Sequence, residues 1–260
     1  MSGAVAGPVL ELLEVQKRFG GLVAVDRLSF AVKRGQIKAL IGPNGAGKTT
    51  VFNLITSLHR LDGGDIVLSG RRASGMASHE VAALGVARTF QNVELFTNMS
   101  VLENVMVGAH VRTRAGLLSS SLRLPAMRAE EARMVQEARE CLRLAGLGEV
   151  PLDREARSLA FGQQRLLEVA RALAARPQLL LLDEPAAGLS TAETARLGEL
   201  VERIRDLGVT VLLVDHDMDL VMRVSEEVVV LDRGVKIAEG EPREVQRDPR
   251  VIAAYLGEET

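Results

Sequence analysis

A glycine-rich loop placed between a strand and a helix is the feature that most constrains this chain. The segment GPNGAGKTT, residues 42–50, fits the pattern G-x-x-x-x-G-K-[ST]. It follows the apolar run IKALI, which predicts a buried strand, and it precedes TVFNLIT, which predicts a helix. Backbone N–H groups of such a loop turn inward around phosphate oxygens, and the helix presents its positive end to the same charge. The sequence therefore predicts a nucleotide phosphate site in an α/β fold.

Two side chains of this loop have specific predicted roles. Lys48 should reach the β- and γ-phosphates, and the Thr49 hydroxyl should ligate Mg²⁺. A nucleotide phosphate chain with Mg²⁺ is therefore the predicted ligand, and the loop alone does not choose among kinases, GTPases and transport ATPases. The predicted nucleotide contacts of the loop are Gly42, Pro43, Asn44, Gly45, Ala46, Gly47, Lys48, Thr49 and Thr50.

Two adjacent carboxylates follow a second apolar strand in the segment LLLLDEP. Because parallel strands present their carboxyl ends at the edge where such sheets bind ligands, Asp183 is placed to hold Mg²⁺ through water. Glu184 is then free to polarise the water that attacks the γ-phosphate. This pair predicts hydrolysis of the nucleotide and not binding alone.

Composition restricts the partners. The formal net charge is −2, from 32 basic and 34 acidic side chains, which gives no overall attraction to nucleic acid or an anionic membrane. Cys141 is the only cysteine, so no internal disulfide or cysteine zinc cluster can form, as suits the cytoplasm. No apolar stretch approaches the roughly 20 residues that span a bilayer, so any membrane contact must come through a partner.

The order of patterns along the chain predicts one domain with an insertion. Strand-like runs between residues 9 and 41 predict an N-terminal antiparallel sheet, and alternating strands and helices from residue 179 predict a parallel sheet covered by helices. The segment between them is largely helical in pattern. We therefore expect residues 1–260 to form a single domain, with an α/β core at 1–91 and 171–260 and a helical subdomain at 92–170.

Local signals mark several boundaries. Ser100 with Glu103, and Ser190 with Glu193, have the spacing of a capping box at a helix start. The segment AGLLSSSLRLPAMR, residues 115–128, predicts an exposed loop, followed by a charged helix over residues 129–144. The segment VVVLDRGVKIAEG predicts a hairpin near the C-terminus.

The segment LAFGQQR, residues 159–165, is similar to the L-S-G-G-Q signature of ATP-binding cassette proteins, with alanine and phenylalanine at its second and third positions. With the other motifs in the same order, the chain resembles the ATP-binding subunit of an ABC transporter over nearly its whole length. The resemblance implies a P-loop NTPase core and a head-to-tail pair of units, in which Gly162 and Gln163 hold the ATP of the partner. The helix expected after the signature would also direct its positive end at that phosphate.

Three further residues acquire roles from this resemblance. It implies that Phe19 stacks on adenine, that Gln91 links the Mg²⁺ site to the membrane partner, and that His216 contacts the γ-phosphate during catalysis. Each also has a plain structural reading, as a core ring, a surface amide and a strand-end residue.

The features LAFGQQR, DEPAAGLS, HDMDLVM and DPRVIAAYLGEE are most similar to the larger ATP-binding subunit of branched-chain amino acid importers. That branch implies membrane permease subunits, an extracytoplasmic substrate-binding protein, a second copy or a related ATP-binding subunit, and a peripheral place on the cytoplasmic face of the membrane. Ser190 and Asp215 depart from the aspartate and glutamate common in the wider family. An exporter or lipid-transport ATPase, or a soluble cassette ATPase acting on nucleic acid or the ribosome, remain the alternatives.

Overall fold

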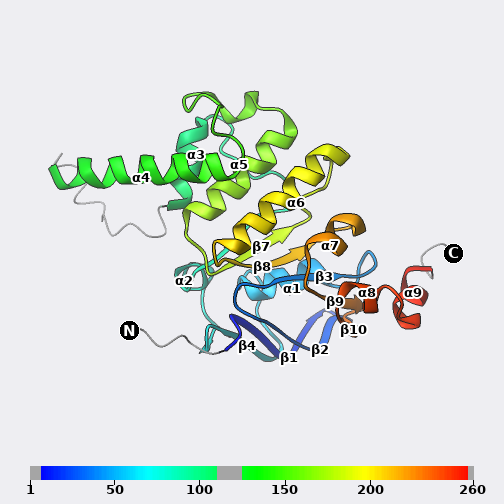
Figure 1. Cartoon of the computed structure of the whole chain (residues 1–260). Coiled ribbons are helices and arrows are strands. Elements are labelled where there is room, and N and C mark those ends of the chain that lie inside the picture. The colour runs from blue at the N-terminus through cyan, green and yellow to red at the C-terminus, as the bar shows by residue number, and fades with distance from the viewer. Residues whose placement is uncertain (1–6, 110–124, 257–260) are drawn as a thin grey trace.

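The computed structural model describes residues 7–109 and 125–256 of the chain. Two sheets are present in this part, one of four strands in the order β2-β1-β4-β5 and one of six in the order β10-β9-β3-β8-β7-β6 (Figure 1). The strands are β1 (Leu10–Phe19), β2 (Leu22–Val32), β3 (Ile37–Ile41), β4 (Gly63–Leu68), β5 (Arg71–Arg72), β6 (Val86–Arg88), β7 (Leu179–Asp183), β8 (Thr210–Val214), β9 (Glu227–Asp232) and β10 (Val235–Gly240).

The four-stranded sheet is antiparallel, and in the six-stranded sheet only the β9–β10 pair is antiparallel. The predicted antiparallel sheet, parallel sheet and C-terminal hairpin are thus confirmed. The helices are α1 (Lys48–Ile55), α2 (Ser78–Ala83), α3 (Val101–Ala109), α4 (Pro125–Leu144), α5 (Phe161–Ala174), α6 (Thr191–Asp206), α7 (Met218–Val224), α8 (Pro242–Val245) and α9 (Pro249–Leu256), with a short 3₁₀ turn at Ala156–Ser158.

The parallel sheet is buried on both faces, which explains the uninterrupted leucines of β7. Leu180 and Leu182 belong to a core cluster with the helices α5, α6 and α7, whereas Leu179 and Leu181 belong to a second cluster with α1 and the antiparallel sheet. Successive side chains of a strand point to opposite faces, so a strand covered on both faces must be apolar throughout.

Three neighbouring strands of this sheet end at predicted functional residues. β3, β8 and β7 run parallel and in adjacent positions. The phosphate loop follows β3, Glu184 follows β7, and His216 comes two residues after β8. Because the carboxyl ends of parallel strands lie at one edge, residues far apart in the sequence meet there.

The helical insertion packs above the sheet as α3, α4 and α5 (Figure 1). α4 begins at Pro125, four residues before the predicted start, because proline is favoured in the first turn of a helix. The prediction of a loop was therefore wrong for residues 125–128, and residues 115–124 lie outside the described residues. Both capping boxes are confirmed: Ser100 N–H donates to Glu103 at 2.8 Å, and Ser190 N–H donates to Glu193 at 2.9 Å.

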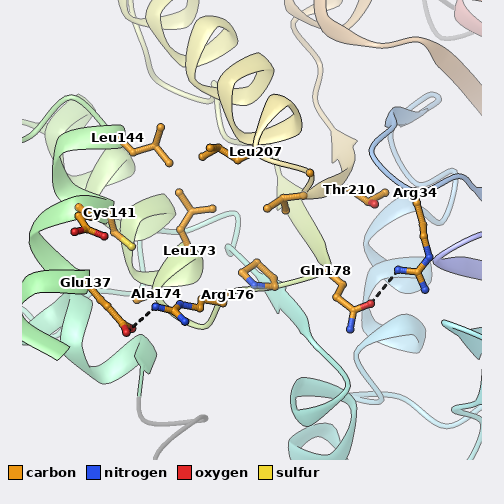
Figure 2. A pocket seen from close by; sticks show the side chains of 14 residues that line it. Arg34, Glu137, Cys141, Leu144, Leu173, Ala174, Arg176, Gln178, Leu207 and Thr210 are labelled. Carbon is orange, nitrogen blue, oxygen red and sulfur yellow. Dashed lines mark hydrogen bonds and ion pairs between the residues drawn. The ribbon is translucent and has the colours of Figure 1, made fainter. Parts of the chain in front are cut away.

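A groove of about 540 Å³ separates α4 from the start of β8 (Figure 2). The charged side chains in it are paired within the chain: Arg176 lies 2.6 Å from the Glu137 carboxylate, and Arg34 donates to the Gln178 amide oxygen at 3.0 Å. The groove lies at the ends of β7 and β8 opposite to the predicted site residues, and none of those residues lines it.

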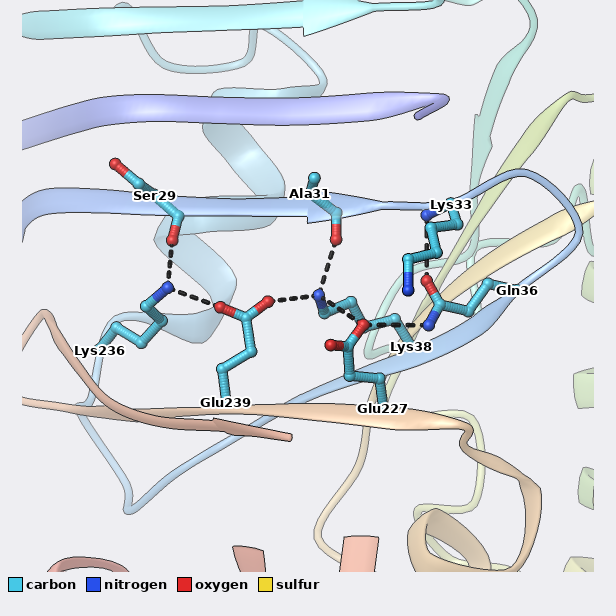
Figure 3. Close-up of polar contacts among 8 residues, drawn as sticks. All are labelled: Ser29, Ala31, Lys33, Gln36, Lys38, Glu227, Lys236 and Glu239. Carbon is cyan, nitrogen blue, oxygen red and sulfur yellow. Dashed lines mark hydrogen bonds and ion pairs between the residues drawn. The ribbon is translucent and has the colours of Figure 1, made fainter. Parts of the chain in front are cut away.

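A buried lysine on β3, the strand that leads into the phosphate loop, links the two sheets (Figure 3). Lys38 on β3 is 1% exposed, and its ammonium donates to the Ala31 carbonyl at 2.7 Å and lies 2.5 and 3.1 Å from the carboxylates of Glu239 and Glu227. Lys236 completes the cluster by donating to the Ser29 carbonyl and to Glu239, each at 2.6 Å. A buried charge is tolerated only when it is paired in this way, so the cluster ties β2, β9 and β10 to the strand that leads into the phosphate loop.

Candidate functional site

Phe19 and residues 44–50, among the predicted nucleotide residues, line one cavity of about 580 Å³ at the carboxyl edge of the parallel sheet, whereas Gly42 and Pro43 do not line it. The phosphate loop forms one wall, and Gln91, Glu184 and His216 face it from other segments. The cavity is lined by Phe19, Leu22, Val23, Ala24, Asn44, Gly45, Ala46, Gly47, Lys48, Thr49, Thr50, Gln91, Glu184, His216 and Arg233.

Two glycines of the phosphate loop are required by close backbone contacts. A Cβ atom on Gly42, whose φ is +150°, would lie 2.0 Å from the Leu231 carbonyl oxygen of β9. A Cβ atom on Gly47, whose φ is +103°, would lie 2.4 Å from the Ala24 carbonyl oxygen of β2. The loop is therefore held between the two sheets, and its shape depends on residues without side chains.

Lys48 is almost fully buried at the start of α1. Its ammonium donates to the carbonyls of Gly42 and Pro43 at 2.6 and 2.8 Å, so the charge sits inside the loop that is expected to hold phosphate. Thr49 is exposed in the first turn of the same helix, whose positive end faces the cavity.

Glu184 has both carboxylate oxygens engaged at the cavity. Oε2 accepts from the Gln91 amide at 2.9 Å, and Oε1 lies 2.8 Å from His216 Nε2. The residue has a left-handed backbone with φ of 48°, a conformation that non-glycine residues adopt at some cost. The strained turn after β7 thus aims the carboxylate across the phosphate loop, between side chains from two other segments.

Asp183, the other carboxylate, is buried beneath the cavity. Burial raises the pKa of Asp183, and the ion pair with Arg88, at 2.6 Å from Oδ2, opposes that shift. Oδ1 is buried and has no hydrogen-bond partner among the residues described. An acceptor oxygen in this state is available to a water molecule or a cation.

Arg88 contacts the predicted site through Asp183 and was not predicted from the sequence. Besides pairing with Asp183, it donates to the Asn53 amide oxygen at 2.7 Å and lies over the rings of Phe52 and Phe90. It ends β6, which is hydrogen-bonded to β7, so strand order alone brings it to Asp183. The only sequence signal that could have pointed to Arg88 is its position, directly after the short apolar run of residues 86–87 and three residues before Gln91.

Phe19 lies at the outer end of the cavity, where 43% of it is exposed. Its ring meets that of His59 edge to face, with centroids 5.2 Å apart. An exposed aromatic face at the mouth of a phosphate site suits stacking on a base.

The signature segment does not reach this cavity. Gly162 and Gln163 lie at the start of α5, and neither lines the site that holds the phosphate loop of the same chain. Ala160 has no side-chain acceptor at the helix start, although its N–H donates to the Gln163 amide oxygen at 3.3 Å. The spacing of Leu166, Val169, Ala170 and Leu173 indicates an apolar helix face, and all four pack in the core, with Leu166 only partly buried.

Over the described residues, no group of three or more His, Cys, Asp or Glu side chains is arranged to hold a metal ion. Within the same residues, no helix is both long enough and apolar enough to cross a bilayer.

The comparisons with known proteins agree with this geometry. The family model described as ABC transporter matches residues 25–187, and one described as branched-chain amino acid ATP-binding cassette transporter matches residues 235–260. The chain is 44% identical over 252 residues to the high-affinity branched-chain amino acid transport ATP-binding protein LivG of Salmonella typhimurium, covering 96% of this chain and 98% of that protein.

Solved structures are similar as well. The ADP conformation of MJ1267, an ATP-binding cassette of an ABC transporter, gives a TM-score of 0.84 at 31% identity over 96% of this chain and 99% of that one. The dimeric structure of MJ0796, a bacterial ABC transporter cassette, gives a TM-score of 0.77 at 25% identity over 90% of this chain and 99% of that one.

Proposed function

Because the chain belongs to the ATP-binding subunits of ABC transporters, we propose that it drives import of a branched-chain or related amino acid through separate membrane subunits. The chain is an ATP hydrolase of the ABC type with the fold of that family. The observation that carries the hydrolysis step is the position of Glu184, which is held by Gln91 and His216 and lines the same cavity as the phosphate loop.

The side chains suggest a division of labour in hydrolysis. Lys48 and the backbone N–H groups of residues 42–50 bind the phosphates and offset their charge. Glu184 accepts a proton from water, whose oxygen attacks the γ-phosphorus while the bond from that phosphorus to the bridging oxygen breaks. ADP and phosphate are the products. His216 lies 2.8 Å from the second oxygen of Glu184 and lines the same cavity, which supports a contact with the γ-phosphate. Phe19 would stack on adenine from the same cavity.

The oxygen donors at the site fit Mg²⁺. The Thr49 hydroxyl faces the cavity, Asp183 has the buried unpartnered oxygen described above, and Gln91 contributes an amide oxygen. Mg²⁺ prefers oxygen ligands and keeps several waters, so it is held by a few side chains and the phosphates, without a cluster of carboxylates. When bound, the ion supplies positive charge to the β- and γ-phosphates.

The distance of the signature segment from its own cavity supports a head-to-tail pair. Gly162 and Gln163 would complete the site of a second ATP-binding subunit, either another copy or a related chain, as the dimeric form of the similar MJ0796 cassette suggests. Hydrolysis would then open the pair, and ATP would close it again.

A second cavity, of about 570 Å³, suits a membrane subunit. It lies between β6, α2, α3 and α5 and exposes the apolar side chains of Leu58, Phe90 and Phe96 beside Arg171. Exposed apolar residues in a groove rimmed by charge mark a protein contact. Docking there places the chain peripherally on the cytoplasmic face of the membrane, and an extracytoplasmic substrate-binding protein acts from the other side.

The substrate proposal comes from likeness along the whole chain. The LivG relative is described as a branched-chain amino acid transport protein, and the model matched at residues 235–260 carries the same description. The net charge of −2 disfavours the alternative of a nucleic-acid partner. We also propose that residues 1–91 and 171–260 form one α/β core and that residues 92–170 form a helical subdomain.

Reconstitution tests the proposal. The chain is co-purified with the membrane subunits encoded beside its gene, placed in liposomes with the cognate binding protein, and supplied with labelled leucine or a basic amino acid. We expect ATP-dependent leucine uptake that is abolished by Glu184→Gln and unchanged by Glu199→Gln on the exposed face of α6. Equal uptake with the Glu184→Gln complex would refute the mechanism, and outward transport would refute import.

A further inference from the structure

Two side chains of helix α5 are hydrogen-bonded to the backbone of the loop that carries Gln91. Arg165 donates through Nη1 to the Phe90 carbonyl at 2.9 Å and through Nη2 to the Gln91 carbonyl. Glu168, one turn further along the helix, accepts from the Phe90 N–H at 3.0 Å. We call Arg165 and Glu168 the clasp, since together they bind the backbone on both sides of residue 90.

The clasp is deeply buried. Arg165 is 5% exposed and Glu168 is 1% exposed, and their charged groups lie 3.5 Å apart. Arg171, on the same helix, adds a further contact by donating to the Glu94 carbonyl. Burial raises the pKa of Glu168, while its hydrogen bond with Phe90 and the nearby arginines oppose that shift. Charges buried to this degree hold their partners in one geometry, because losing a partner leaves an uncompensated charge.

One N–H group of the clasp is not hydrogen-bonded. Arg165 Nε is buried without a hydrogen-bond partner in the part of the chain that the structure describes. A buried donor in this state costs free energy, which the contacts of the rest of the guanidinium have to offset.

The loop held by the clasp carries Gln91, whose side chain contacts the Glu184 carboxylate. Gln91 follows Phe90 directly, and its amide donates to Glu184 at 2.9 Å. A rigid-body shift of α5 would therefore move the Gln91 backbone and change the length of that hydrogen bond, which is well formed in the present geometry.

The start of α5 lies in the signature segment, whose last residue is Arg165. Arg165 lies over the ring of Phe161, the first residue of the helix, with its guanidinium carbon 5.5 Å from the ring centre. A Cβ atom on Gly188, in the loop after Glu184, would lie only 2.9 Å from that ring. One helix thus contacts both the segment that carries Gln91 and the loop that follows Glu184.

We propose that Arg165 and Glu168 are positioning residues. Through them, the position of α5 sets the geometry of the hydrogen bond between Gln91 and Glu184. The proposal rests on the head-to-tail pair of the proposed function. The nucleotide held by the signature of this chain, in the partner's site, then controls the glutamate that acts in this chain's own site. Neither residue of the clasp lines the cavity of its own chain. Both are also buried, at 5% and 1% exposed, so neither is open to the nucleotide that the signature segment would hold for the partner.

A double-mutant cycle on the assembled transporter tests the proposal. Arg165→Lys keeps the charge but cannot bond two successive carbonyls as a guanidinium fork does. We expect kcat for ATP to fall about tenfold with KM changed less than about twofold, as for loss of an interaction made in the transition state. In a Gln91→Ala background the same change should lower kcat by less than about twofold, because the two residues act through one contact. Arg203→Lys, on the exposed face of α6, is the matched control.

Two results overturn the proposal. Losses that multiply in the double variant would mean that Arg165 acts independently of Gln91. A raised KM with unchanged kcat would mean that it affects nucleotide binding. A wild-type transporter that hydrolyses ATP without importing amino acids contradicts the proposed substrate and leaves this cycle interpretable.

Hydrogen exchange of the full chain gives a reading that needs no activity. Glu168→Gln retains an acceptor for the Phe90 N–H and should keep residues 90–94 protected, whereas Glu168→Ala should speed exchange there about tenfold or more with α1 unaffected. Arg165→Lys should have the same local effect as Glu168→Ala. Unchanged exchange at 90–94 in both of those variants would show that the clasp does not hold the loop.

Discussion

Gly162 provides a test of how the signature helix packs. A Cβ atom at this position would lie 2.3 Å from Glu193 Oε1, far inside contact distance. The Glu193 carboxylate cannot turn away freely, because it accepts from the Ser190 N–H at 2.9 Å and lies 2.7 Å from the Ser190 hydroxyl. Gly162→Ala must therefore displace either α5 or the capping box of α6.

The size of the effect follows from this geometry. Overpacking of a tight contact costs about 1–3 kcal/mol, which corresponds to about 2–12 °C in Tm for a chain of this length. The same substitution would otherwise gain about 0.5–1 kcal/mol, because alanine is the better helix former. We expect Gly162→Ala to lower Tm in the wild-type background and to raise it by about 1–4 °C in a Glu193→Ala background.

Calorimetry of the four proteins measures this change of sign. The ATPase rate of the assembled complex should follow stability, since alanine keeps the backbone N–H at residue 162 that would face the partner's phosphate. If Gly162→Ala lowers Tm equally in the wild-type and Glu193→Ala backgrounds, the packing argument is refuted. Gly162→Ala/Glu193→Ala that is stable and inactive would show that the phosphate tolerates no Cβ atom there.

Three further outcomes are expected. Lys48→Ala should weaken ATP binding by about tenfold or more in a nucleotide titration, and a normal affinity would contradict the role assigned to Lys48. Glu184→Gln should bind ATP normally and lose about 10²–10⁴-fold in turnover, measured by phosphate release. Gln91→Ala should reduce transport more than basal hydrolysis by the isolated chain, and equal losses would place Gln91 in the chemical step alone. Ser190→Ala should lower Tm by about 2–4 °C at pH 7. The hydrogen bonds from Ser190 hold the pKa of Glu193 below its usual value, so this difference should shrink as the pH falls through that pKa, and a difference constant with pH would contradict the capping role.

Several features could be predicted from the sequence because their causes are local. The phosphate loop needs glycines between a strand and a helix, and a capping box needs two residues three positions apart, so residues 42–50, Ser190 and Glu193 were found from spacing. The start of α4 was misplaced because a proline can begin a helix as well as interrupt one. Asp183 and Glu184 could be assigned to the site edge because a fully apolar strand precedes them.

The partners of these residues could not be predicted from any local pattern. Arg88 pairs with Asp183 across 95 positions, and Lys38 reaches Glu239 across 201. The order β3-β8-β7-β6 decides the first pairing, and the packing of β2 against the β9–β10 hairpin decides the second.

The sequence by itself determined the chemistry available: a phosphate loop, two carboxylates, a glutamine, a histidine and a modified signature. The tertiary structure decided how they are arranged, with Gln91 and His216 on the two oxygens of Glu184 and with the signature away from its own cavity. The physical reason is that side-chain identity and spacing define what a residue can donate or accept. Which donor meets which acceptor depends on strand order and helix packing, which bring together segments from all parts of the chain.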